Sequence, residues 1–266
     1  VTAVTEQSPS KTVSACFPNP ASSELRVYFG NNYHGERTLE IFSGDGKLVQ
    51  SMVTDNDQLN LPVEQLEPGY YTLHIIGGSR SETLDGAGGH DTIFGLGGND
   101  QLSGGSGNDV LYGDGREPSA TMNGSDHLNG GSGSDVLYGG GSGDFLTGGT
   151  GSDTLYGGTG NDYLRGDGPE DGSVDWLYGG AGIDKFWWLN NGDHAFGGSG
   201  GDDFRFGRAR GDVWIDDYQA GADKLHLPTT NYTVSGDGLT IAVDRVGEPD
   251  LTIHLSSALD PGDIIA

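Results

Sequence analysis

Cysteine and basic residues are scarce in this chain, and long apolar runs are absent. Cys16 is the single cysteine, so no disulfide can form within the chain. Only 13 Lys and Arg residues stand against 39 Asp and Glu residues, and the net charge is -26. Because nucleic acids and anionic lipids attract proteins through Lys and Arg, this balance argues against both as partners. Cations are the partners that such a charge favours.

No apolar run is long enough to cross a membrane. The longest runs, such as Phe186 to Leu189, fall far short of the roughly 20 residues that a span needs. The chain begins at Val1 without a basic and apolar leader, so we expect that a signal was removed or that the chain is a piece of a longer protein. These features predict a soluble protein.

Glycine is the residue in excess. Of the 50 glycines, 36 lie between residues 79 and 205, in units of nine that start from Gly86. Two units carry insertions, at 116–123 and 169–172. The eighth position of every unit is apolar, as in Leu128, Leu137 and Leu146. The sixth position is always aspartate: Asp91, Asp100, Asp109, Asp126, Asp135, Asp144, Asp153, Asp162, Asp175, Asp184, Asp193 and Asp202.

This spacing predicts a metal-binding solenoid. Glycine at the first, second and fourth positions permits backbone angles that let a turn aim its carbonyl groups at one point. The aspartate completes a cage of six to eight oxygen ligands, the set that calcium prefers. Two units close one coil, and the eighth side chain points inward while the seventh and ninth point outward. Carboxylates stacked about 4.8 Å apart would repel one another strongly without cations between them.

The unit GGxGxDxUx resembles the RTX nonapeptide, and residues 78–206 resemble the calcium-binding parallel β-roll of that family. The resemblance implies several calcium ions held by the twelve aspartates. It also implies a chain that stays unfolded in a calcium-poor cytosol and folds in millimolar calcium outside the cell. The unit at Trp188 keeps Asp193 but lacks the early glycines, which predicts a weak or absent ion site there.

The segment 16–77 has the pattern of a small antiparallel β-sandwich, with turn residues between short β-rich runs. The expected strands are 25–29, 38–42, 47–53 and 70–76. The runs FPNPASSELRV, LEIFSGDGKLV and LEPGYYTLHI resemble three blocks of the sorting domain of the type IX secretion system. Residues 1–15 ahead of it are expected to be a flexible segment.

The segment 207–266 returns to a β pattern with little glycine. The run GDVWIDDYQAGADKLHL resembles the cap that follows the β-roll in serralysin-type proteases and other RTX proteins. A solenoid needs such a cap to cover its final coil. We expect Trp187, Trp188, Phe204, Phe206 and Trp214 to form its core. The final run LSSALDPGDIIA resembles the tail that type I secretion reads.

The two sheets of the roll should differ in their outward residues. Alternate ninth positions form a set of six aromatics, Phe94, Tyr112, Tyr138, Tyr156, Tyr178 and Phe196. The other set, from Ser103 to Arg205, is mostly polar. The aromatic face should be covered by another part of the chain, by a docking protein or by a second copy of the chain. Alternatively, Tyr112, Tyr138, Tyr156 and Tyr178 stack on the sugar rings of a polysaccharide.

No sequence motif predicts an enzyme. No HExxH zinc motif occurs. The run GGSGG at 197–201 fits the nucleophile pattern GxSxG, but it stays in register with the repeat and predicts a calcium turn. Acidic pairs such as Asp202 with Asp203 are better explained by calcium ligation and surface charge than by glycosidase chemistry.

The sequence therefore predicts an all-β protein: a sandwich at 16–77, an RTX roll at 78–206 and a β cap at 207–266. We expect a non-catalytic, secreted or surface-bound bacterial region that folds on calcium and serves as a rigid module of an adhesin or a secreted enzyme. A carbohydrate-binding accessory module of a polysaccharide-modifying enzyme is the alternative.

Overall fold

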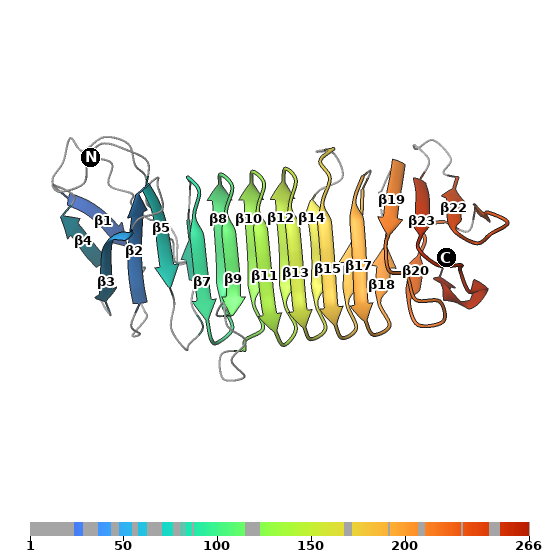
Figure 1. The fold of residues 1–266 in the computed structure, drawn as a ribbon, viewed down its shortest axis with the longest axis horizontal. Helices are drawn as coiled ribbons and strands as arrows, with labels where there is room; N and C mark the ends of the chain where they lie inside the picture. Colours follow the sequence, from blue (N-terminus) through green and yellow to red (C-terminus); the bar gives the residue numbers. More distant parts are fainter. Residues whose placement is uncertain are drawn as a thin grey trace.

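The computed structural model describes residues 24–28, 37–43, 48–54, 58–62, 71–76, 81, 83–86, 88–114, 123–167, 172–190, 192–206, 211–229, 231–244 and 251–265. These residues form β-strands, apart from one short 3-10 helix at Pro261–Asp263. The strands lie side by side along one long axis (Figure 1). No helix in the described residues is both long and apolar enough to cross a membrane.

A parallel two-sheet roll fills the middle of the molecule. The strands that belong to the thirteen-stranded sheet are β7 (Thr92–Leu96), β9 (Val110–Asp114), β11 (Val136–Gly141), β13 (Thr154–Thr159), β15 (Trp176–Ala181) and β17 (His194–Ser199). The strands that belong to the nine-stranded sheet are β6 (Thr83–Asp85), β8 (Gln101–Ser106), β10 (His127–Ser132), β12 (Phe145–Thr150), β14 (Tyr163–Asp167), β16 (Lys185–Trp187) and β18 (Asp203–Arg205). Successive strands alternate between the sheets, so two nonapeptides make one coil, as the period predicts.

The register between coils is constant despite the insertions. Leu137 pairs with Leu155, eighteen residues on. Leu102 pairs with Leu128 across the first insertion, and Leu155 pairs with Leu177 across the second. The insertions therefore do not shift the register of the sheets. Of these insertions, residues 116–122 and 169–171 lie outside the described part of the chain.

The core is a single file of apolar side chains between the two sheets. The eighth residues of the twelve units are at most 2 % exposed. Leu155, Leu164 and Leu177 are completely buried, and Phe186 stacks on Phe204 with ring centroids 4.7 Å apart. The inward orientation predicted for the eighth position is confirmed. A core one side chain thick offers limited apolar burial, which makes the turns important for stability.

The N-terminal strands are antiparallel, but part of them continues the roll. The strands β1 (Glu24–Tyr28) and β4 (Gln58–Pro62) form one pair. The strands β3 (Leu48–Thr54), β2 (Arg37–Ser43) and β5 (Tyr71–Ile76) form a second group, and β5 pairs in parallel with β7. The second group thus belongs to the roll's own sheet rather than to a separate sandwich. The β4 strand was not predicted, and residues 1–15 lie outside the described residues.

The C-terminal strands extend both sheets. The strands β19 (Gly211–Ile215), β23 (Leu251–Leu255), β22 (Thr240–Val243) and β21 (Tyr232–Val234) continue the thirteen-stranded sheet. The strands β20 (Lys224–His226) and β24 (Ile264–Ile265) continue the other. Phe204 and Phe206 are buried as expected. Trp187 and Trp188 are wrongly predicted as core, since both are only half-buried and lie under the guanidinium groups of Arg205 and Arg165. Trp214 is wrongly predicted as core as well. It is half-buried on the outer face, because it pairs with the outward His194 and not with an eighth position.

Candidate metal centre

In every unit except the one at Trp188, glycine at the first position lets the aspartate of that unit lie against the backbone. A Cβ atom added to Gly104 would lie 2.4 Å from Oδ2 of Asp109 and 2.6 Å from the carbonyl oxygen of Gly130 in the next coil. The same pattern recurs at Gly139, whose Cβ would lie 2.5 Å from Oδ2 of Asp144. These turns therefore bring a carboxylate oxygen and a backbone carbonyl from adjacent coils to one place.

The aspartates form two ladders along the roll. In each ladder, the backbone N–H of one aspartate donates to Oδ1 of the aspartate one coil further on, at 2.7 to 3.0 Å. The first ladder contains Asp91, Asp109, Asp135, Asp153, Asp175 and Asp193. The second ladder contains Asp100, Asp126, Asp144, Asp162, Asp184, Asp202 and Asp223. All twelve predicted site residues are at most 6 % exposed, and the structure sorts them into one ladder or the other.

The second carboxylate oxygen of many aspartates is buried without a hydrogen-bond donor. This holds for Oδ2 of Asp91, Asp109, Asp126, Asp135, Asp144, Asp162, Asp184 and Asp202. A buried acceptor without a partner is costly, and a buried charge more so. Burial therefore raises the carboxylate pKa, to about 8 for Asp144 and to about 7 for Asp126 and Asp202. The hydrogen bond to Oδ1 lowers these pKa values only in part.

The oxygen atoms at these turns fit a hard cation. Calcium is bound by carboxylate and carbonyl oxygens, and both are present between adjacent turns. In the described ranges, no group of three or more His, Cys, Asp or Glu side chains converges on one metal-sized site. The donor set that these turns offer is one carboxylate oxygen from a turn together with backbone carbonyls.

In both ladders, the last aspartate accepts a hydrogen bond from a nearby backbone N–H through its second carboxylate oxygen. Oδ2 of Asp193 accepts from the N–H of Asn190 at 2.5 Å, and Oδ2 of Asp223 accepts from the N–H of Gln219 at 2.8 Å. Asp217 accepts from Gly197 and Gly198 with its two oxygens. These N–H groups supply the positive partner for the carboxylates that a cation would supply at the other turns. The sequence predicts a weak or absent site at Asp193, and this contact occupies the oxygen that a cation would need there.

Asp114 is a buried carboxylate that the repeat pattern misses. It stands at a second position, where most units have glycine, and it is 8 % exposed. Its two oxygens accept from the N–H groups of Gly124 and Gly141 at 3.1 and 2.7 Å. It thereby joins the two ends of the first insertion to the next coil. The signal in the sequence was the GD pair at the start of the unit that carries this insertion.

The predicted aromatic face exists as a continuous stack. The rings of Phe94, Tyr112, Tyr138, Tyr156, Tyr178 and Phe196 follow one another with centroids 4.6 to 4.9 Å apart and planes within 14°. Each interior ring thus has a neighbouring ring on both faces. Sugar stacking needs an open ring face, and within this stack only the ring edges and hydroxyls point outward.

Two further rows of aromatic rings were not predicted. On the same sheet, Trp176, His194, Trp214 and His254 stack with centroids 4.2 to 5.1 Å apart. On the opposite sheet, His127, Phe145 and Tyr163 stack at 4.7 and 4.8 Å. The expectation of a mostly polar second face rested on its ninth residues, and this row comes from its seventh residues.

The GxSxG run has no nucleophile geometry. Ser199 ends the roll strand β17 and pairs with Ala181 in β15, in register with the repeat. It therefore occupies a regular strand position rather than a strand-to-helix turn.

Comparisons with known proteins agree with this geometry. The family model of RTX calcium-binding nonapeptide repeats matches residues 76–111, 112–146, 121–154, 138–168 and 171–187. The model of the secretion system C-terminal sorting domain matches residues 15–84. A search of curated proteins gave no significant match. Residues 76–187 therefore match the RTX calcium-binding repeat, and they form the β-roll expected of it. Together with the sorting domain, this match identifies a secreted or cell-surface bacterial module that binds calcium.

Proposed function

We propose that this region is a calcium-dependent folding module, in which ordering of the roll outside the cell follows export of an unfolded chain. The two ladders of buried aspartates carry this proposal, because Oδ2 accepts no hydrogen bond in Asp91, Asp109, Asp126, Asp135, Asp144, Asp162, Asp184 and Asp202. Bound calcium would supply the positive charge that these oxygens lack. The residues that would hold it are the sixth-position aspartates, except Asp193, together with turn carbonyls.

Without a cation, the chain's own residues oppose folding. The charge of neighbouring ladder members raises the pKa of Asp144 further, which shows that they repel one another. The 50 glycines add a large entropy cost of ordering the backbone. Apolar burial in the thin core of the roll offsets little of the charge repulsion and little of the entropy cost. A calcium-poor cytosol should therefore keep the chain unfolded and suited to export.

The C-terminal tail fits the same order of events. Its strand β24 pairs with β20, and Asp263 is 1 % exposed. Any export machinery that reads this tail must do so before the cap forms. After folding, we propose that the roll serves as a stiff module of a surface adhesin or a secreted enzyme.

A calcium titration tests the folding module. The full chain is stripped with a chelator, and far-UV circular dichroism is followed as calcium is added, with magnesium as the control. We expect a cooperative gain of β signal at roughly millimolar calcium and none with magnesium, which prefers a smaller and stricter site. A full β signal in chelator would show a preformed roll and reject the proposal.

A further inference from the structure

Four tyrosines lie next to one another in the aromatic stack on the outer face of the thirteen-stranded sheet. They are Tyr112, Tyr138, Tyr156 and Tyr178, on the successive strands β9, β11, β13 and β15. Phenylalanine occupies both ends of the stack, as Phe94 and Phe196. Since phenylalanine has no hydroxyl group, only the four central rings can lose a phenol proton together with an electron.

The tyrosine rings lie close enough for a bond to form between neighbouring coils. The rings of Tyr156 and Tyr178 have centroids 4.9 Å apart and planes that differ by 10°. Those of Tyr138 and Tyr156 are also 4.9 Å apart, with planes that differ by 5°. Parallel pairing in register places equivalent atoms of these rings opposite one another. Rotation of one ring about its Cα–Cβ bond therefore brings a Cε carbon, next to the carbon that carries the hydroxyl, against a Cε carbon of its neighbour.

The hydroxyl groups lie along the outer edge of the stack. All four tyrosines are half-buried, because each ring is covered on both faces by its neighbours and open at its rim. Burial raises the pKa of Tyr178, and the charge of an ionised Tyr156 raises it further, so the two hydroxyl groups lie near each other. A small oxidant can reach this edge while the stack keeps the rings together.

We propose that this row of tyrosines is a site of oxidative cross-linking, in which neighbouring residues join as dityrosine. Each of two neighbours loses one electron and its phenol proton to a one-electron oxidant, such as a haem peroxidase that consumes hydrogen peroxide. The two phenoxyl radicals form a carbon–carbon bond between their Cε atoms, and the hydrogens on these carbons move to the oxygens. Hydrogen peroxide takes up the two electrons and two protons and becomes two molecules of water.

The cross-link fastens adjacent coils of the roll to each other. Tyr156 and Tyr178 are 22 residues apart and lie on either side of the second insertion. A covalent link between them restricts the unfolded chain, as a disulfide does, and should raise the folding equilibrium constant about a hundredfold. In the proposed function, the link follows folding in calcium and makes the folded roll less dependent on its ions.

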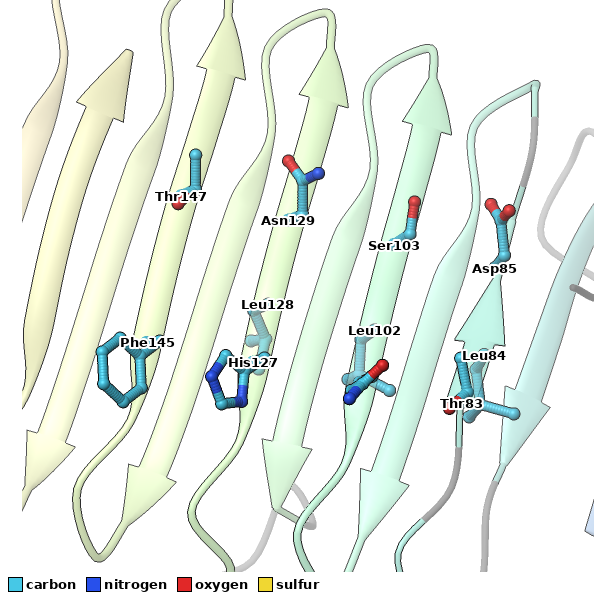
Figure 2. A pocket seen from close by; sticks show the side chains of 11 residues that line it. Thr83, Leu84, Asp85, Leu102, Ser103, His127, Leu128, Asn129, Phe145 and Thr147 are labelled. Carbon is cyan, nitrogen blue, oxygen red and sulfur yellow. The ribbon is translucent and has the colours of Figure 1, made fainter. Parts of the chain in front are cut away.

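Tyr163 on the opposite sheet is a matched control within the same chain. It is half-buried and lies 4.8 Å from Phe145 between ring centroids, so it is stacked as closely as the four tyrosines. Figure 2 shows Phe145 beside His127 in this second row, and the ring of Trp187 follows Tyr163 at 6.5 Å. Neither described ring neighbour of Tyr163 is a tyrosine, so stacking alone should leave it without a cross-link.

Oxidation of the folded chain in calcium by a haem peroxidase and hydrogen peroxide tests the proposal. Dityrosine fluorescence measures the yield, and mass spectrometry of proteolytic peptides identifies the linked pairs, each lighter by two hydrogen atoms. We expect links between neighbours in the row and within one chain. Four tyrosines in a row allow two links, and Tyr156→Phe leaves one pair, so this variant should halve the yield and abolish links to Tyr178. Tyr163→Phe should change neither.

Circular dichroism in calcium confirms that each variant is folded, and the chain in urea with chelator is the unfolded reference. In that reference, links should spread over many tyrosine pairs. The same spread in the folded chain, or links to Tyr163 as frequent as links to Tyr156, would overturn the proposal. Links between chains in place of links within one chain would overturn it as well. Because the reference is unfolded by urea, these results do not depend on whether calcium alone folds the roll.

Urea unfolding of the linked monomer in calcium tests whether the coils are fastened. The linked chain should unfold at a higher urea concentration than the untreated chain, and linked Tyr163→Phe should match it. An unchanged midpoint in a chain that carries the Tyr156–Tyr178 link would reject the stabilising role of the cross-link.

Discussion

Aspartate has two roles in this molecule, and the atoms around Oδ2 separate them. At Asp144, Oδ2 is buried against Gly139 with no donor, as a cation ligand requires. At Asp193, the same atom accepts from the N–H of Asn190. In both carboxylates, Oδ1 accepts from the backbone N–H of the preceding aspartate in the ladder, so the difference lies in one local contact. The identity of the residue alone does not assign the role.

The substitution Asp144→Asn should therefore differ from Asp193→Asn. The first keeps an Oδ1 acceptor for the ladder but puts an amide where a cation ligand stood, and we expect about one calcium ion fewer per chain. The second should leave the number of ions unchanged and cost about 1 kcal/mol of folding stability through the lost acceptor. Titration calorimetry gives the number of ions, and urea unfolding in calcium gives the stability. Equal loss of ions in both variants would show that Asp193 is a ligand.

The aspartates of each ladder affect one another's pKa, because they are buried side by side in a low-dielectric interior. Burial, together with the charge of neighbouring aspartates, raises the pKa of Asp91 and Asp202 to about 7. The neutral acid is therefore the form that the metal-free roll prefers. In the aromatic stacks, by contrast, repetition is favourable, because identical neutral rings meet at the strand spacing.

The metal-free chain should consequently fold better in acid. A carboxylate with a folded-state pKa above its ordinary value favours folding while protonated, and this contribution is lost as the pH rises through the folded-state pKa. The loss falls between the ordinary and the folded-state pKa, which is between about pH 4 and pH 8 for Asp144 and between about pH 4 and pH 6 for Asp162. We expect the chain, chelated and then desalted, to gain β signal as the pH is lowered from 8 to 5. A β signal that does not change between pH 8 and pH 5 would contradict this prediction.

The whole molecule is an open-ended roll, and its ends must be covered. At the N-terminal end, β5 pairs with β7 and carries β2 and β3 with it. At the C-terminal end, Asp263 is 1 % exposed and ties three parts of the cap together. It accepts from the Tyr218 hydroxyl at 2.6 Å, the Gly221 N–H at 2.7 Å and Lys224 at 2.5 Å.

Removing this carboxylate should loosen the cap. In Asp263→Ala, the Tyr218 hydroxyl and Lys224 lose a shared partner, and we expect a loss of about 3 kcal/mol in unfolding free energy in calcium. The exposed Asp260 nearby, which accepts from the Gly262 N–H, is the matched control, with a loss of about 1 kcal/mol on change to Ala. Urea denaturation measures both. If the two variants lose equally, the buried contacts of Asp263 add nothing.

The sequence by itself determined the repeating part of the molecule. A period of nine with Gly, Asp and an apolar eighth residue can bury that residue only if two units make one coil. The same period puts Tyr138 over Tyr156 and aligns the twelve aspartates, since equal spacing along the chain becomes equal position in a parallel sheet. The RTX resemblance and the predicted calcium ligands followed from these positions alone.

Only the tertiary structure decided what happens where the period stops. Asn190 turns its N–H to Asp193, Trp214 continues an outer row rather than the core, and β5 joins the roll instead of closing a sandwich. These contacts join residues without a shared spacing, so they depend on the path of the folded chain and not on a local pattern.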